Sequence, residues 1–114
     1  MKELSLTPYP GRIFLCQTRK ELHKKYKKMT GNKYPYKDPS IMSGRYIYIE
    51  GKNGEVWFLV YGNRASTLAH EFLHCLLTLF GLVGIDPSAS IGEPICYMMS
   101  RLMREALDEE AMNE

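Results

Sequence analysis

The chain has 114 residues, of which 45% are hydrophobic and 25% are charged. These are ordinary values for a globular protein and exclude an intrinsically disordered chain. The length suits one compact unit, so we expect residues 1–114 to form a single domain.

The formal net charge is only +2, but it is unevenly distributed. Residues 1–52 contain 12 Lys and Arg against 4 Asp and Glu, whereas residues 53–114 contain 3 against 9. A basic segment of this kind can bind a polyanion. Equally, two halves of opposite charge can attract one another in the folded protein.

The N-terminus has no basic-then-apolar signal sequence, which predicts a cytoplasmic protein. The longest apolar run, residues 68–82, contains two His and one Glu, and we expect it to be too short to span a bilayer. The three cysteines are odd in number and lack CxxC spacing, so buried free thiols in a reducing compartment are expected at Cys16, Cys75 and Cys96.

The first half of the chain opens with a predicted strand at residues 11–17. Thr18 then fits a helix N-cap, with Glu21 in the position of a capping-box partner. The basic helix that follows should end near Thr30–Gly31, because glycine suits the left-handed terminus of a helix. Residues 31–44 have no clear periodicity and are expected to form a loop.

A β-hairpin is predicted next. Residues 45–50 and 55–61 are rich in aromatic and β-branched side chains, and Asn53-Gly54 between them is a strong signal for a hairpin turn. The chain is therefore expected to be of the α+β class, with an antiparallel sheet or hairpin packed on helices.

Two further helices are expected. The first runs from Ala65 or Ser66 to Leu82 or Val83, and Gly81 and Gly84 mark its end. After a loop at residues 85–91, the last helix runs from about Gly92 to Ala111. Its core stripe is assigned to Ile95, Met98 or Met99, Leu102 and Ala106.

The sequence His70-Glu71-Phe72-Leu73-His74 lies within the first of these helices. Residues four apart share a helical face, so both imidazoles can bind one metal ion, with Glu71 near enough to polarise a water bound to it. The helix is apolar almost all round, which predicts that it is buried and that its polar side chains need a metal or other partners. The alternative is two core histidines bonded to the backbone, with Glu71 facing solvent.

A catalytic zinc site usually has three protein ligands and one open position. Glu93 is the preferred third ligand, because a helix that follows a short loop can pack back across the first helix. Glu93 also fits a capping box with Ser90, and Pro94 fits the first turn of a helix. Asp86 is the other candidate ligand, although it fits better as a turn residue before Pro87.

Tyr97 lies four residues after Glu93 and shares its helical face. Its phenol could donate a hydrogen bond to a developing oxyanion beside the metal. An aromatic side chain in the core between the helices is the alternative.

These residues resemble the glutamate-liganded branch of the zincin metallopeptidases: an HExxH helix after a strand pair, then Glu93 on the following helix. More narrowly, residues 66–74, Gly84-Ile85 and residues 92–97 are similar to small, uncharacterised metallopeptidase-like proteins of tailed phages and prophages. The resemblance covers residues 56–107 and the general element order of the first half.

The resemblance implies a small zincin-like domain and one zinc ion bound by His70, His74 and Glu93. It also implies that Glu71 is the general base, and a phage origin would put the protein in the host cytoplasm. The expected function is therefore a zinc metallopeptidase, a hydrolase in which Glu71 activates a zinc-bound water and Tyr97 assists. The chain is short for a second lobe or a deep specificity pocket.

The expected substrate is a peptide or protein, and a host protein is one candidate. An extended peptide could pair with the exposed edge of the hairpin, which we assign to residues 55–61 because they lead directly into the site helix. His and Glu ligands would also accept manganese, cobalt or nickel.

Two other functions remain open. Zinc could act as a staple between helices in a non-catalytic module that binds a host protein. Alternatively, the basic helix at residues 18–30 could bind nucleic acid, with stacking surfaces supplied by Tyr26, Tyr34 and Tyr36. A basic run of this kind is more often a solvated face.

Overall fold

The computed structural model describes residues 1–39 and 41–108 of the chain. In chain order the elements are β1 (Lys2–Ser5), β2 (Gly11–Cys16), α1 (Arg19–Thr30), β3 (Gly44–Glu50), β4 (Val56–Gly62), α2 (Ala65–Val83), the 3₁₀ turn η1 (Ala89–Gly92) and α3 (Glu93–Ala106). The part of the chain described here is thus an α+β fold, as predicted, with one four-stranded sheet and three α-helices.

The sheet is mixed, with the strand order β1-β2-β4-β3. The β1–β2 and β3–β4 pairs are antiparallel, but β2 and β4 are parallel, so a wholly antiparallel sheet was a wrong prediction. The assignment of residues 55–61 to the edge was also wrong, because β4 lies in the centre of the sheet and β3 is the edge strand of the hairpin. Nearly every residue of β4 from Val56 to Tyr61 is buried, and a strand that is apolar on both faces belongs inside a sheet.

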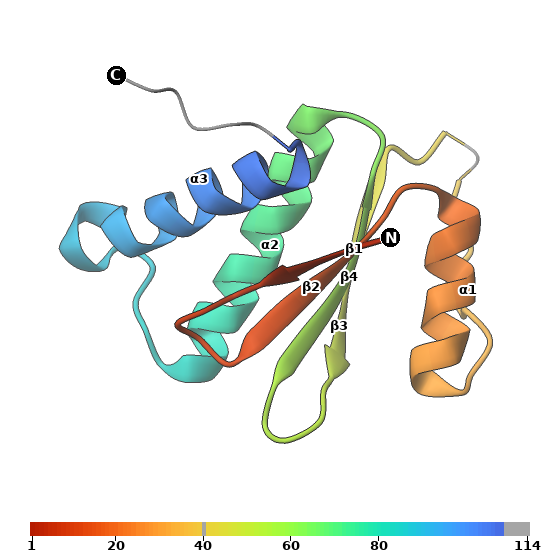
Figure 1. The fold of residues 1–114 in the computed structure, drawn as a ribbon, viewed down its shortest axis with the longest axis horizontal. Coiled ribbons are helices and arrows are strands. Elements are labelled where there is room, and N and C mark those ends of the chain that lie inside the picture. Colours follow the sequence, from red (N-terminus) through yellow and green to blue (C-terminus); the bar gives the residue numbers. More distant parts are fainter. Residues whose placement is uncertain (40, 109–114) are drawn as a thin grey trace.

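Helices cover both faces of the sheet (Figure 1). α2 and α3 pack on one face, where they share a core with alternate strand residues such as Ile13, Phe58 and Val60. α1 packs on the other face, where Leu22 joins a smaller core with residues such as Leu59. The period-two alternation of the strands distributes these side chains between the two layers.

Local signals in the sequence fix most element ends as predicted. The Thr18 hydroxyl accepts a hydrogen bond from the backbone N–H of Glu21 at 3.1 Å, and Gly31 ends α1 in the left-handed region. Asn53 and Gly54 both have positive φ, which matches the twist of a two-residue hairpin turn. Gly84 is the left-handed C-cap of α2.

One strand, one helix end and the exposure of one cysteine differ from expectation. The short strand β1 lacks a strong pattern in the sequence and was not predicted. α3 ends at Ala106, and Leu107 and Asp108 already form a turn; the rest of the expected helix, residues 109–111, lies outside the described residues. Cys96 is exposed, whereas Cys16 and Cys75 are buried free thiols as predicted.

α2 is less enclosed than its composition suggested. One face packs on the sheet, but Leu73, Leu77 and Leu82 are exposed, so the prediction of a helix buried all round was wrong. At 19 residues it is also long and apolar enough to cross a bilayer, contrary to the prediction. The core helix of a globular domain meets the same criterion, since it too needs a long apolar stretch.

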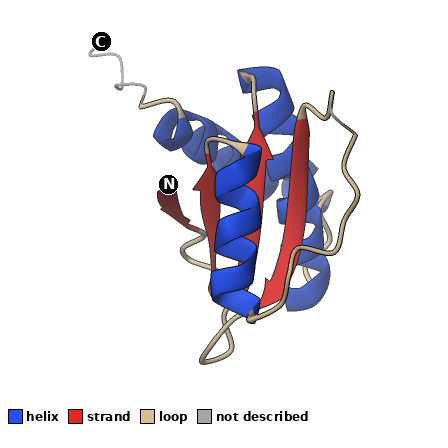
Figure 2. Cartoon of the chain, turned by 90° about the vertical axis from the view of Figure 1, so that its right-hand side faces the viewer, coloured by secondary structure: helices blue, strands red, loops and turns tan. Residues whose placement is uncertain are grey.

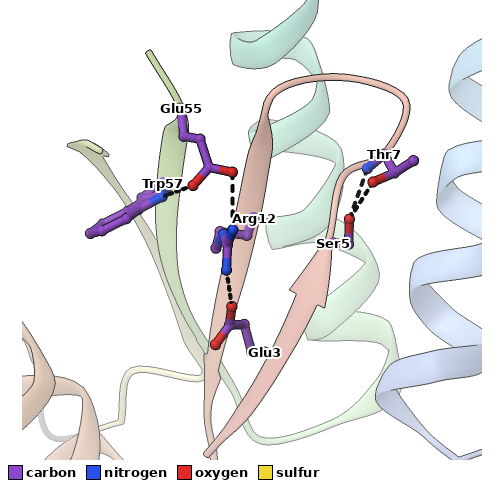
Figure 3. A network of polar contacts seen from close by, with 6 residues as sticks. All are labelled: Glu3, Ser5, Thr7, Arg12, Glu55 and Trp57. Atoms are coloured by element: carbon purple, nitrogen blue, oxygen red, sulfur yellow. Dashed lines mark hydrogen bonds and ion pairs between the residues drawn. The ribbon is translucent and has the colours of Figure 1, made fainter. Parts of the chain in front are cut away.

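A polar network ties three strands together on the face that α1 only partly covers (Figure 3). Arg12 of β2 donates to Glu3 of β1 and, at 3.1 Å, to Glu55 just before β4. Trp57 donates its indole N–H to the same Glu55 carboxylate, also at 3.1 Å. These hydrogen bonds lower the pKa of Glu55 and raise that of Arg12, because they stabilise the charged forms of both groups.

Candidate metal centre

The HExxH residues lie in the first half of α2, where its buried face meets solvent. Phe72, Cys75 and Leu76 face the core, so the neighbouring helix positions lie at its margin. The His70 side chain is 67% exposed, which excludes the alternative of a histidine bonded within the core. The helix thus presents both imidazoles where a small ligand or ion can reach them.

The two imidazoles are directed at one another. Their Nε2 atoms are 3.2 Å apart, and the ring centroids are 4.8 Å apart at an interplanar angle of 77°. Zinc binds imidazole nitrogen at 2.0–2.1 Å, so two such ligands at a tetrahedral angle have nitrogens about 3.3–3.4 Å apart. The observed Nε2 separation therefore suits two ligands of one ion.

Glu71 lies beneath this pair and is only 7% exposed, so the alternative in which it faces solvent was wrong. Its Oε1 is 3.9 Å from the His70 Nε2. Burial raises the pKa of Glu71, and the nearby charges of His70, His74 and Arg45 oppose that rise only in part. A carboxyl group with a raised pKa is suited to accepting and returning a proton near neutral pH.

Tyr46 of β3 also belongs to this site and was missed by the sequence analysis. Its ring stacks on the His74 imidazole with centroids 4.7 Å apart and planes 11° from parallel, which fixes the orientation of that ring. Tyr46 and Tyr48 alternate with the buried Ile47 and Ile49, which face α1. The period-two alternation was visible in the sequence, but which face α2 would cover was not.

An open cavity of about 640 Å³ adjoins the site. His70 and Glu71 form one wall, the first turn of α2 contributes Ser66 and Thr67, and residues before and at the start of β3 close the other side. Gly44 makes this approach possible, because a Cβ there would overlap the Thr67 methyl group and lie 3.2 Å from the Glu71 Cγ. The cavity brings solvent and a ligand of moderate size to the carboxylate.

The structure does not bring the proposed third ligand to the two imidazoles. Within residues 1–39 and 41–108, no three His, Cys, Asp or Glu side chains come close enough together to hold a metal ion. Glu93 begins α3, and its capping box with Ser90 is absent since Gly92 is the N-cap and makes no side-chain cap bond. Asp86 instead accepts hydrogen bonds from the backbone and hydroxyl of Ser88, which lowers its pKa and supports its role as a turn residue.

Tyr97 lies outside the core between the helices, because it is 72% exposed. The core stripe of α3 is formed as predicted by Met98 and Leu102, with Ile95 packed beside them. Tyr46 is thus the tyrosine that contacts an imidazole of the HExxH sequence.

No protein-family model matches the sequence, and comparisons with curated proteins and with solved structures give no match either. The geometry of the site itself therefore carries the functional inference. That geometry supplies two nitrogen ligands at a suitable separation, a buried carboxylate and an accessible cavity. Within residues 1–39 and 41–108 it offers two imidazole nitrogens to a metal ion and no third protein ligand.

Proposed function

We propose that the protein is a zinc-dependent hydrolase that acts on peptide bonds. The observation that supports this most strongly is the pairing of the His70 and His74 Nε2 atoms at 3.2 Å above a buried Glu71. A buried carboxylate with a raised pKa, beside an accessible cavity, is a common arrangement for a catalytic base.

In this proposal His70 and His74 hold the metal, and the stack of Tyr46 on His74 keeps that imidazole in its binding orientation. Zinc would supply a Lewis acid and lower the pKa of water. Glu71 takes a proton from the attacking water and returns it to the leaving amine. Burial raises the pKa of Glu71 and so makes its carboxylate a stronger base in the first of these transfers.

The edge strand β3 offers a binding surface for an extended peptide. It pairs with β4 on one side, and Tyr46 places it beside the imidazoles. A substrate strand that adds to the free side of β3 gains main-chain hydrogen bonds and passes near the cavity wall formed by Glu71. The geometry supports this class of substrate without specifying a sequence.

The test combines zinc content with peptide hydrolysis. We expect the wild-type protein to retain about one zinc ion after dialysis, and His74→Ala to lose it, because a single imidazole binds zinc weakly. His23→Ala is the matched control, since His23 lies on α1 at the other face of the sheet. A wild-type protein without stoichiometric zinc would contradict the proposal.

The Glu71→Gln variant separates catalysis from a structural metal. We expect it to retain zinc and to lose at least a hundredfold in the rate of cleavage of a quenched fluorescent peptide library, a typical contribution of a general base. Unchanged cleavage would exclude Glu71 as the base. Zinc binding without any cleavage by the wild type would favour the non-catalytic staple.

Glu93→Ala tests the third ligand. The described arrangement of α3 predicts that this variant retains as much zinc as the wild type, because Glu93 is not grouped with the imidazoles. Loss of zinc in Glu93→Ala, with retention in Asp86→Ala, would show instead that α3 moves to bring Glu93 to the site when metal binds.

A further inference from the structure

A second cavity lies on the opposite face of the molecule from the HExxH site. It has a volume of about 780 Å³ and lies between α1 and residues 33–36. Five lysines line it, four from α1 and one from the segment that follows, together with His23, Tyr34 and Tyr36. We call it the basic groove. Figure 2 shows α1 on the outer side of the sheet, with no other helix over it.

The charge of the basic groove is not neutralised within the fold. Residues 19–38 contain eight Lys and Arg and only two acidic residues, Glu21 and Asp38. Glu21 pairs with the N-terminal amine at 3.2 Å. The Asp38 side chain is only 4% exposed and pairs with Arg45 at 2.5 Å. Among the described residues, the five groove lysines form no ion pair, and all five are exposed.

The lysines of α1 are spaced so that they act together. Lys20, Lys24 and Lys28 lie four residues apart and so share one helical face, with Lys27 beside them. Between Lys20 and Lys28 the helix rises about 12 Å, which is a row of charges rather than a single point. A row of cations along a groove suits a flexible chain of phosphates better than one compact anion.

Aromatic rings form the floor of the basic groove. Tyr34 is buried and bonded through its hydroxyl to Asp38, and the His23 ring stacks on it at 4.0 Å with planes 19° apart. Tyr36 meets the edge of Tyr34 at 5.2 Å and remains 43% exposed. The network that anchors Tyr34 therefore holds two accessible rings, His23 and Tyr36, next to the lysines.

We propose that the basic groove binds single-stranded nucleic acid. The phosphates lie along the α1 lysines, and an unpaired base stacks on Tyr36 or His23. The combination favours a single strand over a duplex or a lipid surface, because a stacking platform needs a base free of its partner, whereas lysines alone would serve any anion.

The test is fluorescence anisotropy of labelled twelve-residue oligo(dT) and oligo(U) with the full chain. If about four phosphates are contacted, raising the salt concentration from 50 to 200 mM should weaken binding about 50-fold, since the affinity for a single strand falls with a slope of about −0.7 per phosphate. The DNA and RNA arms show which sugar is preferred, and either preference supports the proposal.

Two variants separate charge from stacking. Lys24→Glu with Lys28→Glu should weaken binding at least tenfold and make the salt dependence shallower. Tyr36→Leu should weaken binding at least fivefold with the salt dependence unchanged, because it removes a stacking surface and no charge. Lys52→Glu, in the exposed β3–β4 turn, makes the same change of charge outside the basic groove and should leave affinity near the wild-type value.

The proposal would be overturned by tighter binding to a twelve-base-pair duplex or to phosphatidylserine vesicles than to the single strands. It would also be overturned if Tyr36→Leu bound normally, or if Lys52→Glu weakened binding as much as the groove variants. Thermal unfolding of each variant shows whether it is folded, and zinc content shows whether the HExxH site is intact.

Discussion

The two faces of the sheet differ in where their ionisable side chains lie. On the face covered by α2 and α3, a carboxylate is buried against a large apolar core, and two imidazoles lie at its margin. On the face covered by α1, the core is smaller and rich in aromatic rings, and the charges point outward as a row of lysines. The face covered by α2 and α3 thus places one buried carboxylate and two imidazoles at a single site, whereas the face covered by α1 spreads positive charges over its surface.

This contrast explains the uneven charge of the sequence. Attraction between the two halves is present but limited, since Lys2 pairs with Asp108 at 2.6 Å and Arg12 pairs with Glu55 at 3.1 Å. The groove lysines of α1 take no part in those pairs. Most of the excess positive charge of the first half therefore faces solvent, which is the arrangement expected of a surface that binds a polyanion.

The largest expected effect concerns the relative stability of the two cores. Phe72→Ala removes a fully buried ring of α2 and should lower the free energy of unfolding by about 3–5 kcal/mol. Leu22→Ala in α1 should have a smaller effect of about 2–3 kcal/mol, because it removes a smaller side chain and because fewer buried residues surround it. Urea unfolding measures both values.

The exposed Leu77 is the control for these two changes. Leu77→Ala should alter the free energy of unfolding by less than about 0.5 kcal/mol, because Leu77 is 44% exposed and lies outside the buried core. An equal loss from Phe72→Ala and Leu22→Ala would remove the difference that we draw between the two faces.

Gly44→Ala should disturb the junction of β3 with α2. The added methyl group would overlap Thr67 and lie 3.1 Å from the Tyr61 carbonyl oxygen, so we expect a loss of about 1–3 kcal/mol in the free energy of unfolding. Peptide cleavage should fall too, since the proposed base Glu71 is displaced. The quenched fluorescent peptide assay measures this second effect.

Gly81 provides a matched control for that substitution. A Cβ at Gly81 meets nothing within 4 Å, and the residue lies in α2 with helical geometry. Gly81→Ala should therefore stabilise the protein by about 0.5–1 kcal/mol. Destabilisation by both changes would mean that any methyl group added near α2 is harmful, and the Gly44 contact would lose its significance.

The link between α2 and α3 contains a strained residue. Ile91 is β-branched, 96% exposed and held at φ 60°, a left-handed conformation that such residues rarely adopt. Ile91→Gly should raise the free energy of unfolding by about 1 kcal/mol, because glycine accepts positive φ. Leu82→Gly, an exposed position with helical φ, should have the opposite sign, and thermal unfolding compares the two.

The α1 face should also give folding stability a dependence on pH. Burial raises the pKa of Cys16 to about 11 in the folded protein, so between about pH 9 and pH 11 the unfolded chain loses this proton more readily. Folding stability should therefore fall as the pH rises through this window. The Cys16→Ala variant should lose part of that slope in urea titrations, whereas Cys96→Ala, at an exposed position, should retain it.

The sequence predicted those parts of the fold that local chemistry determines. The Thr18 cap, the Asn53-Gly54 turn, and the limits of α1 and α2 depend on side chains acting on their own neighbourhood, and each was confirmed. The position of β4 was predicted wrongly. The order of strands depends on pairing between segments that are far apart in the sequence, and no local pattern indicates such pairing.

The candidate site likewise has features that local spacing determines and features that long-range packing determines. The spacing of His70 and His74 fixes their relative geometry within one helix, and the structure brings their Nε2 atoms together as predicted. The stack of Tyr46 on His74 depends on the packing of β3 against α2 and could not be read from spacing. The position of Glu93 depends on the path of the α2–α3 link, where Ser90 and Ile91 adopt left-handed conformations that their residue types do not favour.

The parallel pairing of β2 with β4 has a consequence for how the chain folds. Gly11 pairs with Val56, so this contact must close a long loop, whereas the β3–β4 hairpin closes through a short turn. The hairpin and α2 are local enough to form first, with β1 and β2 docking afterwards. During synthesis the basic α1 segment emerges before its supporting sheet exists, and its aromatic rings acquire their final neighbours only when β4 has been made.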